Sequence, residues 1–318
     1  MKMNNSTADL NYELYEGLRF VGKWNKCAYT LIRKLGAGVT GIVYLAKGDA
    51  GLVAIKFGQD QMSIAQEVNV LKQFSKVQEK VLGPCLFDVD DFESNYHTLP
   101  FYVMEYIQGK DFVLFMKDRG GEWLHVLTIQ LLQCLNELHE QGWVFGDLKP
   151  DNVIITNKEA TVRLLDVGGT TRIGRAVKEY TEYYDRGFWS LGSRKAEPSY
   201  DLFSVAMIMI DCAYPTQFKK EQGNTFAQLK KKINQAPLLK PYQEVIIKAL
   251  QGGFQTAAQM KQALMTTGDT KVVERNLSRK QYRVEKKRQK KQSKLFDLLL
   301  VSSFVLLLFV LYLLLRMF

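Results

Sequence analysis

The chain has 318 residues, of which 47% are apolar and 24% charged. This balance supports about two domain-sized cores and excludes collagen-like, coiled-coil and disordered chains. The formal net charge is +10, but residues 271–294 carry eleven Lys or Arg against two Glu, whereas residues 1–270 carry 31 basic and 30 acidic groups. The basic character therefore belongs to one segment, and the body before it is nearly neutral.

The cysteines and the start of the chain both favour a reducing compartment. Cys27, Cys85, Cys134 and Cys212 form neither a Cys-x-x-Cys pair nor a metal-ligand pattern, which predicts free thiols rather than a disulfide scaffold. The opening residues, MKMNNSTADLNYELYEG, are polar and acidic, so we expect no secretory signal peptide before the fold.

Hydrophobic patterning predicts strands first and helices later. Between residues 29 and 57, the runs YTLIRKL, GIVYLAK and LVAIKF alternate with glycine turns, as antiparallel strands do. A helix with a polar outer face is expected at Ser63–Phe74. Further helices are expected at 124–140, 201–213, 225–234, 241–251 and 256–265. The layout is a small β-rich unit followed by a larger α-rich one.

A glycine-rich segment joins the first two of these strands. It runs Leu35-Gly-Ala-Gly-Val-Thr-Gly-Ile-Val43, with Gly36, Gly38 and Gly41 at the turn. Glycine lets backbone N–H groups approach a polyphosphate that side chains would keep away. The alternative is an ordinary glycine-rich hairpin.

A lysine lies inside the apolar strand that follows. Lys56 ends Val-Ala-Ile-Lys, where an unpaired ammonium would be costly to bury. Glu67, on the helix at 63–74, is the candidate that holds Lys56 against phosphate oxygens. The alternative is that Glu67 faces solvent.

Two later motifs complete a recognisable set. They are Phe145-Gly-Asp-Leu-Lys-Pro-Asp-Asn152 and Leu164-Leu-Asp-Val-Gly168. With the glycine-rich segment, Lys56 and Glu67, they resemble the protein kinase superfamily in order and spacing, over roughly residues 28–265. The resemblance implies an α+β, bilobal protein-kinase-like fold with a β-rich N-lobe and a larger α-helical C-lobe.

The resemblance also implies ATP and Mg²⁺ as cofactors and gives each residue a role. Asp147 would orient the substrate hydroxyl and accept its proton, and Lys149 would steady the transferring phosphoryl group. Asn152 and Asp166 would hold magnesium, because hard oxygen ligands must converge where the polyphosphate lies. Lys149 favours serine or threonine residues of proteins as substrates.

The adenine site and the base of the catalytic loop follow from the same resemblance. Phe101–Ile107 (FYVMEYI) looks like the hinge, with Met104 as gatekeeper and the backbone of Glu105 and Ile107 facing the adenine edge. The expected nucleotide-binding residues are Leu35, Gly36, Gly38, Gly41, Val43, Ala54, Lys56, Met104, Glu105, Ile107 and Ile154. Asp201 would support the catalytic loop from beneath; its alternative is a simple helix N-cap.

Three departures from the family pattern bear on regulation. Phe145 and Gly146 replace the usual His-Arg, so the arginine that grips a phosphorylated activation loop is missing. Val167 replaces the usual Phe of the metal loop. No convincing Ala-Pro-Glu closes the activation segment, because Ala196-Glu197 lies too near Asp201; Thr181 falls about where the family's substrate-loop threonine does.

Two other functions compete with an active protein kinase. Gly146-Asp147 is also similar to the motif of aminoglycoside-type phosphotransferases, which act on small molecules. A pseudokinase scaffold is the second alternative, favoured by Phe145, Val167 and the missing Ala-Pro-Glu. All expected phosphate- and metal-contacting residues are nonetheless present.

The C-terminal region predicts membrane attachment. Leu298–Leu315 has no charge and is long enough, at about 1.5 Å per residue, to cross a hydrocarbon core as a helix. The Lys and Arg residues before it place the kinase in the cytoplasm, attached to the cell membrane by a single span. The expected parts are an N-lobe at 1–107, a C-lobe at 108–268, a basic juxtamembrane segment at 269–296 and a transmembrane helix at 297–316.

The basic segment, Lys271–Lys294, predicts a polyanionic partner. Anionic lipid and non-specific DNA are the candidates, and a topology signal with nothing bound is the alternative. This tail-anchored layout resembles the Hanks-type serine/threonine kinases of spore-forming bacteria, which implies a role in sporulation.

Overall fold

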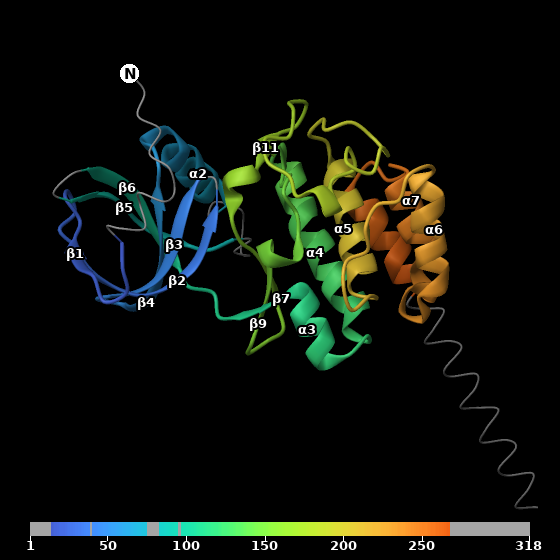
Figure 1. Cartoon of the computed structure of the whole chain (residues 1–318), viewed down its shortest axis with the longest axis horizontal. Helices are drawn as coiled ribbons and strands as arrows, with labels where there is room; N and C mark the ends of the chain where they lie inside the picture. The colour runs from blue at the N-terminus through green and yellow to red at the C-terminus, as the bar shows by residue number, and fades with distance from the viewer. Residues whose placement is uncertain (1–13, 39, 75–82, 95–96, 268–318) are drawn as a thin grey trace, which may run out of the picture. The chain divides into compact units, whose positions relative to one another are not determined.

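The N-lobe is built on one antiparallel sheet of six strands in the order β1-β2-β3-β4-β6-β5 (Figure 1). The structure, a computed structural model, describes residues 14–38, 40–74, 83–94 and 97–267. The strands are β1 (Arg19–Val21), β2 (Ala28–Gly38), β3 (Gly41–Gly48), β4 (Gly51–Gly58), β5 (Leu86–Glu93) and β6 (Thr98–Glu105). The three predicted strands correspond to β2, β3 and β4.

Aromatic side chains fill the interior of this sheet. The ring of Phe57 lies 5.6 Å from that of Phe20 and 5.5 Å from that of Phe101, centroid to centroid, and all three are buried. Phe92 adds a fourth ring, 6.2 Å from Phe57. Alternate residues of a strand point to one face, and Val53, Ile55 and Phe57 of β4 belong to this buried cluster.

One helix packs on the sheet and carries Glu67. It is α2 (Gln61–Phe74), close to the predicted Ser63–Phe74. Ile64, Val68 and Leu71 are buried as their helical spacing requires. Before the helix, Asp60 accepts a hydrogen bond from the Ser63 amide at 2.9 Å, which satisfies one backbone donor of the first turn.

The C-lobe is mainly helical (Figure 1). Its helices are α3 (Phe112–Arg119), α4 (Trp123–Glu140), α5 (Pro198–Asp211), α6 (Thr225–Gln235) and α7 (Gln243–Leu250), with a further helix beginning at Ala257. The leucines at 124, 127, 131, 135 and 138, which have helical spacing in the predicted helix at 124–140, are all buried in α4. Every residue of α5 from Ser199 to Asp211 is buried, so this helix, predicted at 201–213, lies in the core.

Short strands in the C-lobe hold the two motif loops. A three-stranded sheet contains β7 (Gly109–Asp111), β9 (Val153–Thr156) and β10 (Val162–Leu164), and β8 (Trp143–Val144) pairs with β11 (Thr171–Arg172). The loop of Asp147 connects β8 to β9, and Asp166 follows β10. The predicted division after residue 107 falls in the connection from β6 to β7.

The remaining sequence predictions have mixed outcomes. All four cysteines are free thiols, as expected. Within the described ranges, no helix is long and apolar enough to cross a bilayer. The predicted basic segment at 269–296 and span at 297–316 lie outside the described residues.

The aromatic interior of the N-lobe gives a stability prediction. Phe57→Ala should lower the free energy of unfolding by about 3–5 kcal/mol, because it leaves a cavity among three rings. Phe87→Ala is the control, since Phe87 is 59% exposed and its loss should cost less than about 0.5 kcal/mol. Urea denaturation followed by tryptophan fluorescence measures both, and equal losses would contradict the assignment of Phe57 to the core.

Candidate active site

Three charged side chains that are far apart in sequence meet between the sheet, α2 and the loop after β10. The Lys56 ammonium Nζ lies 2.7 Å from Oε2 of Glu67 and 3.4 Å from Oδ1 of Asp166. Lys56 and Glu67 are only 4% and 3% exposed. Glu67 therefore turns toward Lys56 and not toward solvent.

Tyr102 of β6 joins this cluster, and sequence reasoning missed it. Its hydroxyl donates to Glu67 Oε2 at 2.8 Å, and Tyr102 lies opposite Lys56 in the β4–β6 register. Within an apolar strand, a tyrosine gives no sign of a polar partner. Only the pairing of β4 with β6 brings its hydroxyl to the carboxylate.

The electrostatics of the cluster favour its charged form. Burial alone would lower the pKa of Lys56, but the carboxylates of Asp166 and Glu67 outweigh it and raise that pKa above its ordinary value. Burial, and then the same two carboxylates, raise the pKa of Tyr102 well above its ordinary value. Lys56 is therefore a fixed cation, and Tyr102 stays a neutral donor.

The glycines of the glycine-rich hairpin are of two kinds, those that packing requires and those that it does not. A Cβ atom on Gly41 would lie 2.1 Å from the carbonyl oxygen of Phe57, so the fold itself requires glycine there. A Cβ atom on Gly36 or Gly38 would meet nothing within 4 Å. Packing does not explain these two glycines, and the open space beside them fits a bound polyphosphate.

The catalytic loop brings three predicted residues and Thr181 together. Asp147 Oδ2 lies 2.7 Å from Lys149 Nζ, and Asp147 Oδ1 accepts from the Thr181 hydroxyl at 2.8 Å. Lys149 also donates to Thr181 at 3.2 Å. The Asn152 amide nitrogen donates to the Asp147 carbonyl at 2.9 Å, which ties the end of the loop to its beginning.

Asp166 and Asn152 are the residues expected to hold a magnesium ion that is shared with phosphate. Asp166 has a left-handed backbone (φ 43°), and its side chain is 49% exposed although Lys56 contacts it. Among the residues the structure describes, no three His, Cys, Asp or Glu side chains converge as a metal site. Mg²⁺ commonly takes one or two protein oxygens and completes its shell with phosphate and water, which these two residues suit.

A buried carboxylate supports the catalytic loop. Asp201 in α5 accepts hydrogen bonds from the backbone N–H of Phe145 at 2.8 Å and of Gly146 at 3.0 Å. His139 of α4 contacts it at 2.8 Å through Nε2. Asp201 is not a helix N-cap, because it lies in the first turn of α5, whose N-cap is Glu197. His139 is a buried partner of Asp201, which its spacing in the sequence did not indicate.

Gly146 has a backbone requirement of its own. Its φ is +86°, a region that favours glycine, and a Cβ atom there would lie 2.8 Å from the Gly169 carbonyl oxygen. An arginine at this position would be strained. The path of the loop therefore disfavours an arginine directly before Asp147.

The predicted nucleotide residues lie on both lobes. Ala54 pairs with Met104 between β4 and β6, and Val43 pairs with Lys56 between β3 and β4. Ile154 of β9 lies against Gly109, where a Cβ atom would be 2.5 Å from Ile154 Cγ2.

The hinge residue Glu105 has a structural role that the sequence did not reveal. Its carboxylate lies 2.7 Å from Arg163, and its amide donates to the Cys85 carbonyl at 2.8 Å. The expected contacts of Leu35, Glu105 and Ile107 with adenine stay predictions.

The activation segment is closed by its own ion pairs. Glu197, directly before α5, lies 2.8 Å from Arg186, and Asp185 lies 2.7 Å from Arg194. From the sequence, Ala196-Glu197 lies too near Asp201 to match the family's closing motif. The structure corrects this: Glu197 does close the segment, and its partner Arg186 lies within the segment.

The aromatic residues of this segment mostly pack in the interior. Tyr183, Tyr184 and Trp189 are buried. Tyr180 is 41% exposed, and the Arg194 guanidinium covers its ring at 3.9 Å.

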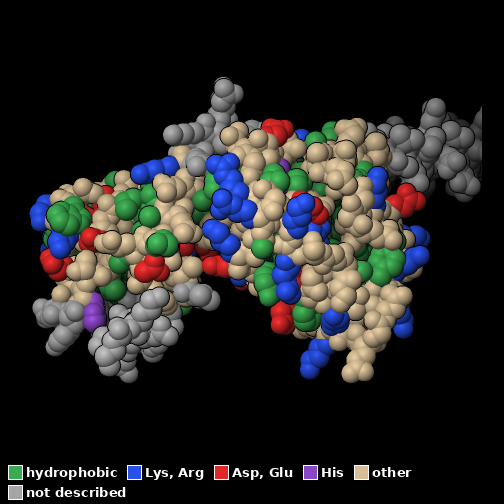
Figure 2. All heavy atoms as spheres, turned by 90° about the horizontal axis from the view of Figure 1, so that it is seen from above, with side chains coloured by type: hydrophobic (Ala, Val, Ile, Leu, Met, Phe, Trp, Pro, Cys, Tyr) green, Lys and Arg blue, Asp and Glu red, His purple; other side chains and the backbone are tan. Residues whose placement is uncertain are grey.

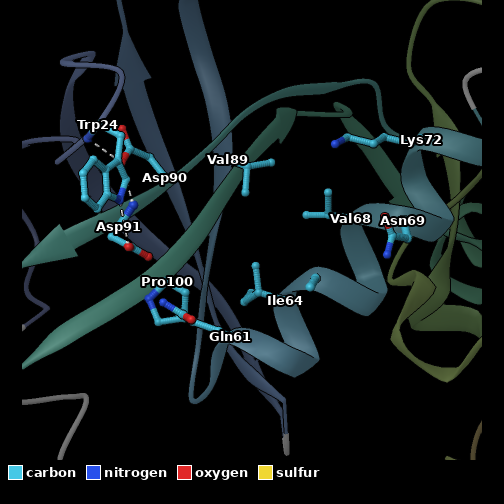
Figure 3. Close-up of a pocket in the computed structure, with 11 residues that line it drawn as sticks. Trp24, Gln61, Ile64, Val68, Asn69, Lys72, Val89, Asp90, Asp91 and Pro100 are labelled. Carbon is cyan, nitrogen blue, oxygen red and sulfur yellow. Dashed lines mark hydrogen bonds between the residues drawn. The ribbon is translucent and has the colours of Figure 1, made fainter.

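A cavity of about 370 Å³ lies elsewhere, between α2 and β5 (Figure 3). Trp24, Ile64, Val68 and Val89 are among the residues that line it. None of its lining residues belongs to the predicted site. The chemistry of the motif residues therefore does not concern this cavity.

Comparisons with known proteins agree with the geometry. Residues 29–270 match the protein kinase domain. Serine/threonine-protein kinase YabT of Bacillus subtilis (strain 168) is 50% identical over 84% of this chain and 79% of its own length. Serine/threonine-protein kinase sid1 of Schizosaccharomyces pombe is 26% identical over 59% of this chain and 41% of its own length.

These matches show to which protein family the chain belongs. The chain belongs to the protein kinase family and has its bilobal fold. Within that family it is a bacterial Hanks-type serine/threonine kinase, similar to YabT. Protein kinases act on proteins and generally use ATP and Mg²⁺.

The two kinds of glycine give a prediction for nucleotide binding. Gly38→Ala should weaken ATP binding about tenfold, with little change in the melting temperature, because its Cβ atom meets only the space left for a ligand. Gly41→Ala should lower the melting temperature by several degrees, because its Cβ atom meets the Phe57 carbonyl. Calorimetric titration with ATP and thermal denaturation measure the two effects; a stability loss in Gly38→Ala alone would reverse the assignment.

Proposed function

We propose that this chain transfers the γ-phosphoryl group of ATP to serine or threonine hydroxyls of proteins, using Lys56, Glu67, Asp147, Lys149, Asn152 and Asp166. The observation that carries the proposal is the contact of Asp147 with both Lys149 and a threonine hydroxyl. Thr181 shows that a hydroxyl can approach this carboxylate within hydrogen-bond distance, with an ammonium beside it.

Each residue has a separate task. When bound, ATP would supply the phosphoryl group, and Mg²⁺ would neutralise phosphate charge. Lys56, held by Glu67, presents a fixed cation to phosphate oxygens. Asp147 orients the acceptor hydroxyl and takes its proton, and Lys149 stabilises negative charge beside it. Asp166 and Asn152 would hold the metal ion.

Neither alternative function has equal support. A scaffold without activity does not require a paired, buried Lys56 or a catalytic loop held by a buried carboxylate. A small-molecule phosphotransferase does not need the threonine of the activation segment at Asp147 and Lys149. Both observations favour protein phosphorylation.

Asp147→Asn tests the catalytic assignment. It keeps the shape of the side chain and removes the charge that accepts the proton, so kcat should fall by about 10²–10⁴-fold. Transfer of labelled phosphate to a generic protein substrate at saturating ATP measures this. The assignment fails if Asp147→Asn keeps near-normal turnover.

Asp151→Asn is the matched control for that loss. It removes the same charge from an exposed side chain of the same loop. We expect it to retain activity, with both variants showing the circular dichroism spectrum of the unaltered chain.

Membrane attachment is part of the same proposal. We place one span at residues 297–316, with the kinase on the cytoplasmic face of the cell membrane. Support comes from the uncharged run Leu298–Leu315 and from the eleven basic residues that precede it. A role in sporulation rests only on the family resemblance.

The basic segment is proposed to bind a polyanion. Attraction to anionic lipid decays within a Debye length of roughly 8 Å, whereas a helix of this length would extend over about 35 Å. Only the half nearest the span, Lys286–Lys294, would then contact lipid. Arg275, Arg279, Lys280 and Arg283 would remain for DNA phosphates, with Tyr282 available to stack on exposed bases.

Truncation separates the two ligands of this segment. A chain ending at Phe296 should bind duplex DNA, with affinity falling at least about tenfold between 50 and 200 mM salt, whereas a chain ending at Asp269 should not bind. Fluorescence anisotropy with DNA and sedimentation with anionic vesicles measure the two interactions. Equal DNA affinity for both chains would exclude the segment as a DNA site, and unchanged phosphorylation with DNA would exclude a regulatory role.

A further inference from the structure

Two stretches of the activation segment pair beside the catalytic loop and present four exposed cations. The Gly174 amide donates to the Ala196 carbonyl at 2.8 Å, the Ala196 amide to the Arg175 carbonyl at 2.7 Å, and the Val177 amide to the Arg194 carbonyl at 2.9 Å. We call residues 172–178 with 194–196 the basic ladder. Its four exposed cations are Arg172, Arg175, Lys178 and Lys195.

The basic ladder is fixed against the catalytic loop. Val177 and Ala196 are buried in one cluster with Val144 and Tyr200. A Cβ atom on Gly146 would lie 3.4 Å from Val177 Cγ1, so the ladder contacts the residue that precedes Asp147. A polypeptide that presents a hydroxyl to Asp147 would therefore have the basic ladder beside it.

The four cations of the ladder form no ion pair within the described residues, although Glu197 lies near enough to Lys195 to interact with it electrostatically. Arg186 and Arg194 are paired with Glu197 and Asp185, but within the described part of the chain no carboxylate lies at ion-pair distance from the four cations. Arg172 stacks on Trp143 at 4.1 Å, and Lys178 donates to Gln66 at 3.3 Å, so both are positioned by neutral groups.

Two acidic residues of the segment also make no ion pair with these four cations. Of the acidic residues next to the ladder, Glu179 is half-buried and Glu182 is exposed, and neither forms an ion pair within the described ranges. Figure 2 shows basic side chains gathered near the middle of the visible face. An anion bound to the ladder would therefore not have to displace an existing carboxylate.

A phosphate on the segment's own threonines does not explain these cations. Thr170 and Thr171 are each 1% exposed, and the Thr181 hydroxyl is held by Asp147 and Lys149. None of the three is open to modification in this conformation. A phosphate on one of these three threonines is therefore not the anion that the ladder attracts.

We propose that the basic ladder selects protein substrates that carry acidic side chains close to the acceptor serine or threonine. The inference rests on the proposed function, because it concerns the chain that presents its hydroxyl to Asp147. A polypeptide is favoured over nucleic acid because the ladder lies against the loop that receives a protein hydroxyl. Several exposed ion pairs, each weak, add up to selectivity that falls with salt.

The test compares two peptides that differ only in flanking charge. With the full chain, a threonine peptide flanked by Asp and Glu should have a kcat/KM about tenfold higher at low salt than its Asn and Gln counterpart, mainly through KM. Arg175→Gln with Lys195→Gln should reduce this ratio to about twofold. Lys230→Gln with Lys231→Gln on α6 removes two exposed charges elsewhere and should leave the ratio unchanged.

Charge reversal provides the sharpest form of the test. Arg175→Glu with Lys195→Glu should make the chain prefer a Lys-flanked peptide, which general loss of structure cannot do. Equal kcat/KM for the acidic and amide peptides overturns the proposal, as does a ratio that survives Arg175→Gln with Lys195→Gln. So does a loss of DNA affinity in that variant without a loss of peptide selectivity.

Failure of the proposed kinase activity can be distinguished from failure of the ladder proposal. If no peptide or protein is phosphorylated, the proposed function is wrong. Binding of the acidic peptide with Ala at the acceptor position then tests separately whether the ladder recognises acidic side chains. Anisotropy with the labelled peptide should show affinity that falls in Arg175→Gln with Lys195→Gln. If the unaltered chain does not bind the peptide, or if the double variant binds it equally well, the ladder proposal is overturned in that case as well.

Discussion

The buried ammonium of Lys56 is the constraint on which the rest of the site depends. An unpaired charge at 4% exposure would be too costly, so Lys56 requires both Glu67 and Asp166, and Glu67 in turn takes the Tyr102 hydroxyl. These partners come from α2, from β6 and from the loop after β10. The position of α2 on the sheet and the position of the metal loop are thereby coupled through one cation, and a shift of either one would leave a charge unpaired.

Asp201 is a second buried charged group, and it is stabilised in a different way from Lys56. Its carboxylate is fully buried, yet its partners are two backbone N–H groups and His139, and no Lys or Arg of the described residues is in contact with it. It can take this position because α5 is apolar on all sides and lies in the core, so a carboxylate near its start is held rigidly. Charge-assisted hydrogen bonds to the loop backbone then fix Asp147 without involving its side chain.

The sequence predicted those parts of the fold and site in which a residue type has a single physical explanation for its position. Glycines at a hairpin, a lysine in an apolar strand and leucines at helical spacing indicated the nucleotide loop, Lys56 and α4. The strands of two to four residues, β8 to β11, are too short to show a period. Strand β5 was missed because it is rich in aspartate, and Asp90 is buried there by accepting from the amides of Trp24 and Asn25. Tyr102 and Arg186 were missed because only the folded chain brings them to their partners.

The same folded contacts change how regulation should be viewed. A phosphate-dependent kinase uses an arginine before its catalytic aspartate to order the activation segment, but here φ of +86° at Gly146 favours glycine and excludes that device. The segment is instead held by Asp185–Arg194 and Arg186–Glu197, and its Thr181 contacts Asp147. A phosphate on this segment would find no arginine at position 146 to pair with. We therefore expect control to act on what reaches the site: the substrate, through the charge around the acceptor, or the local concentration of kinase and partner at a surface.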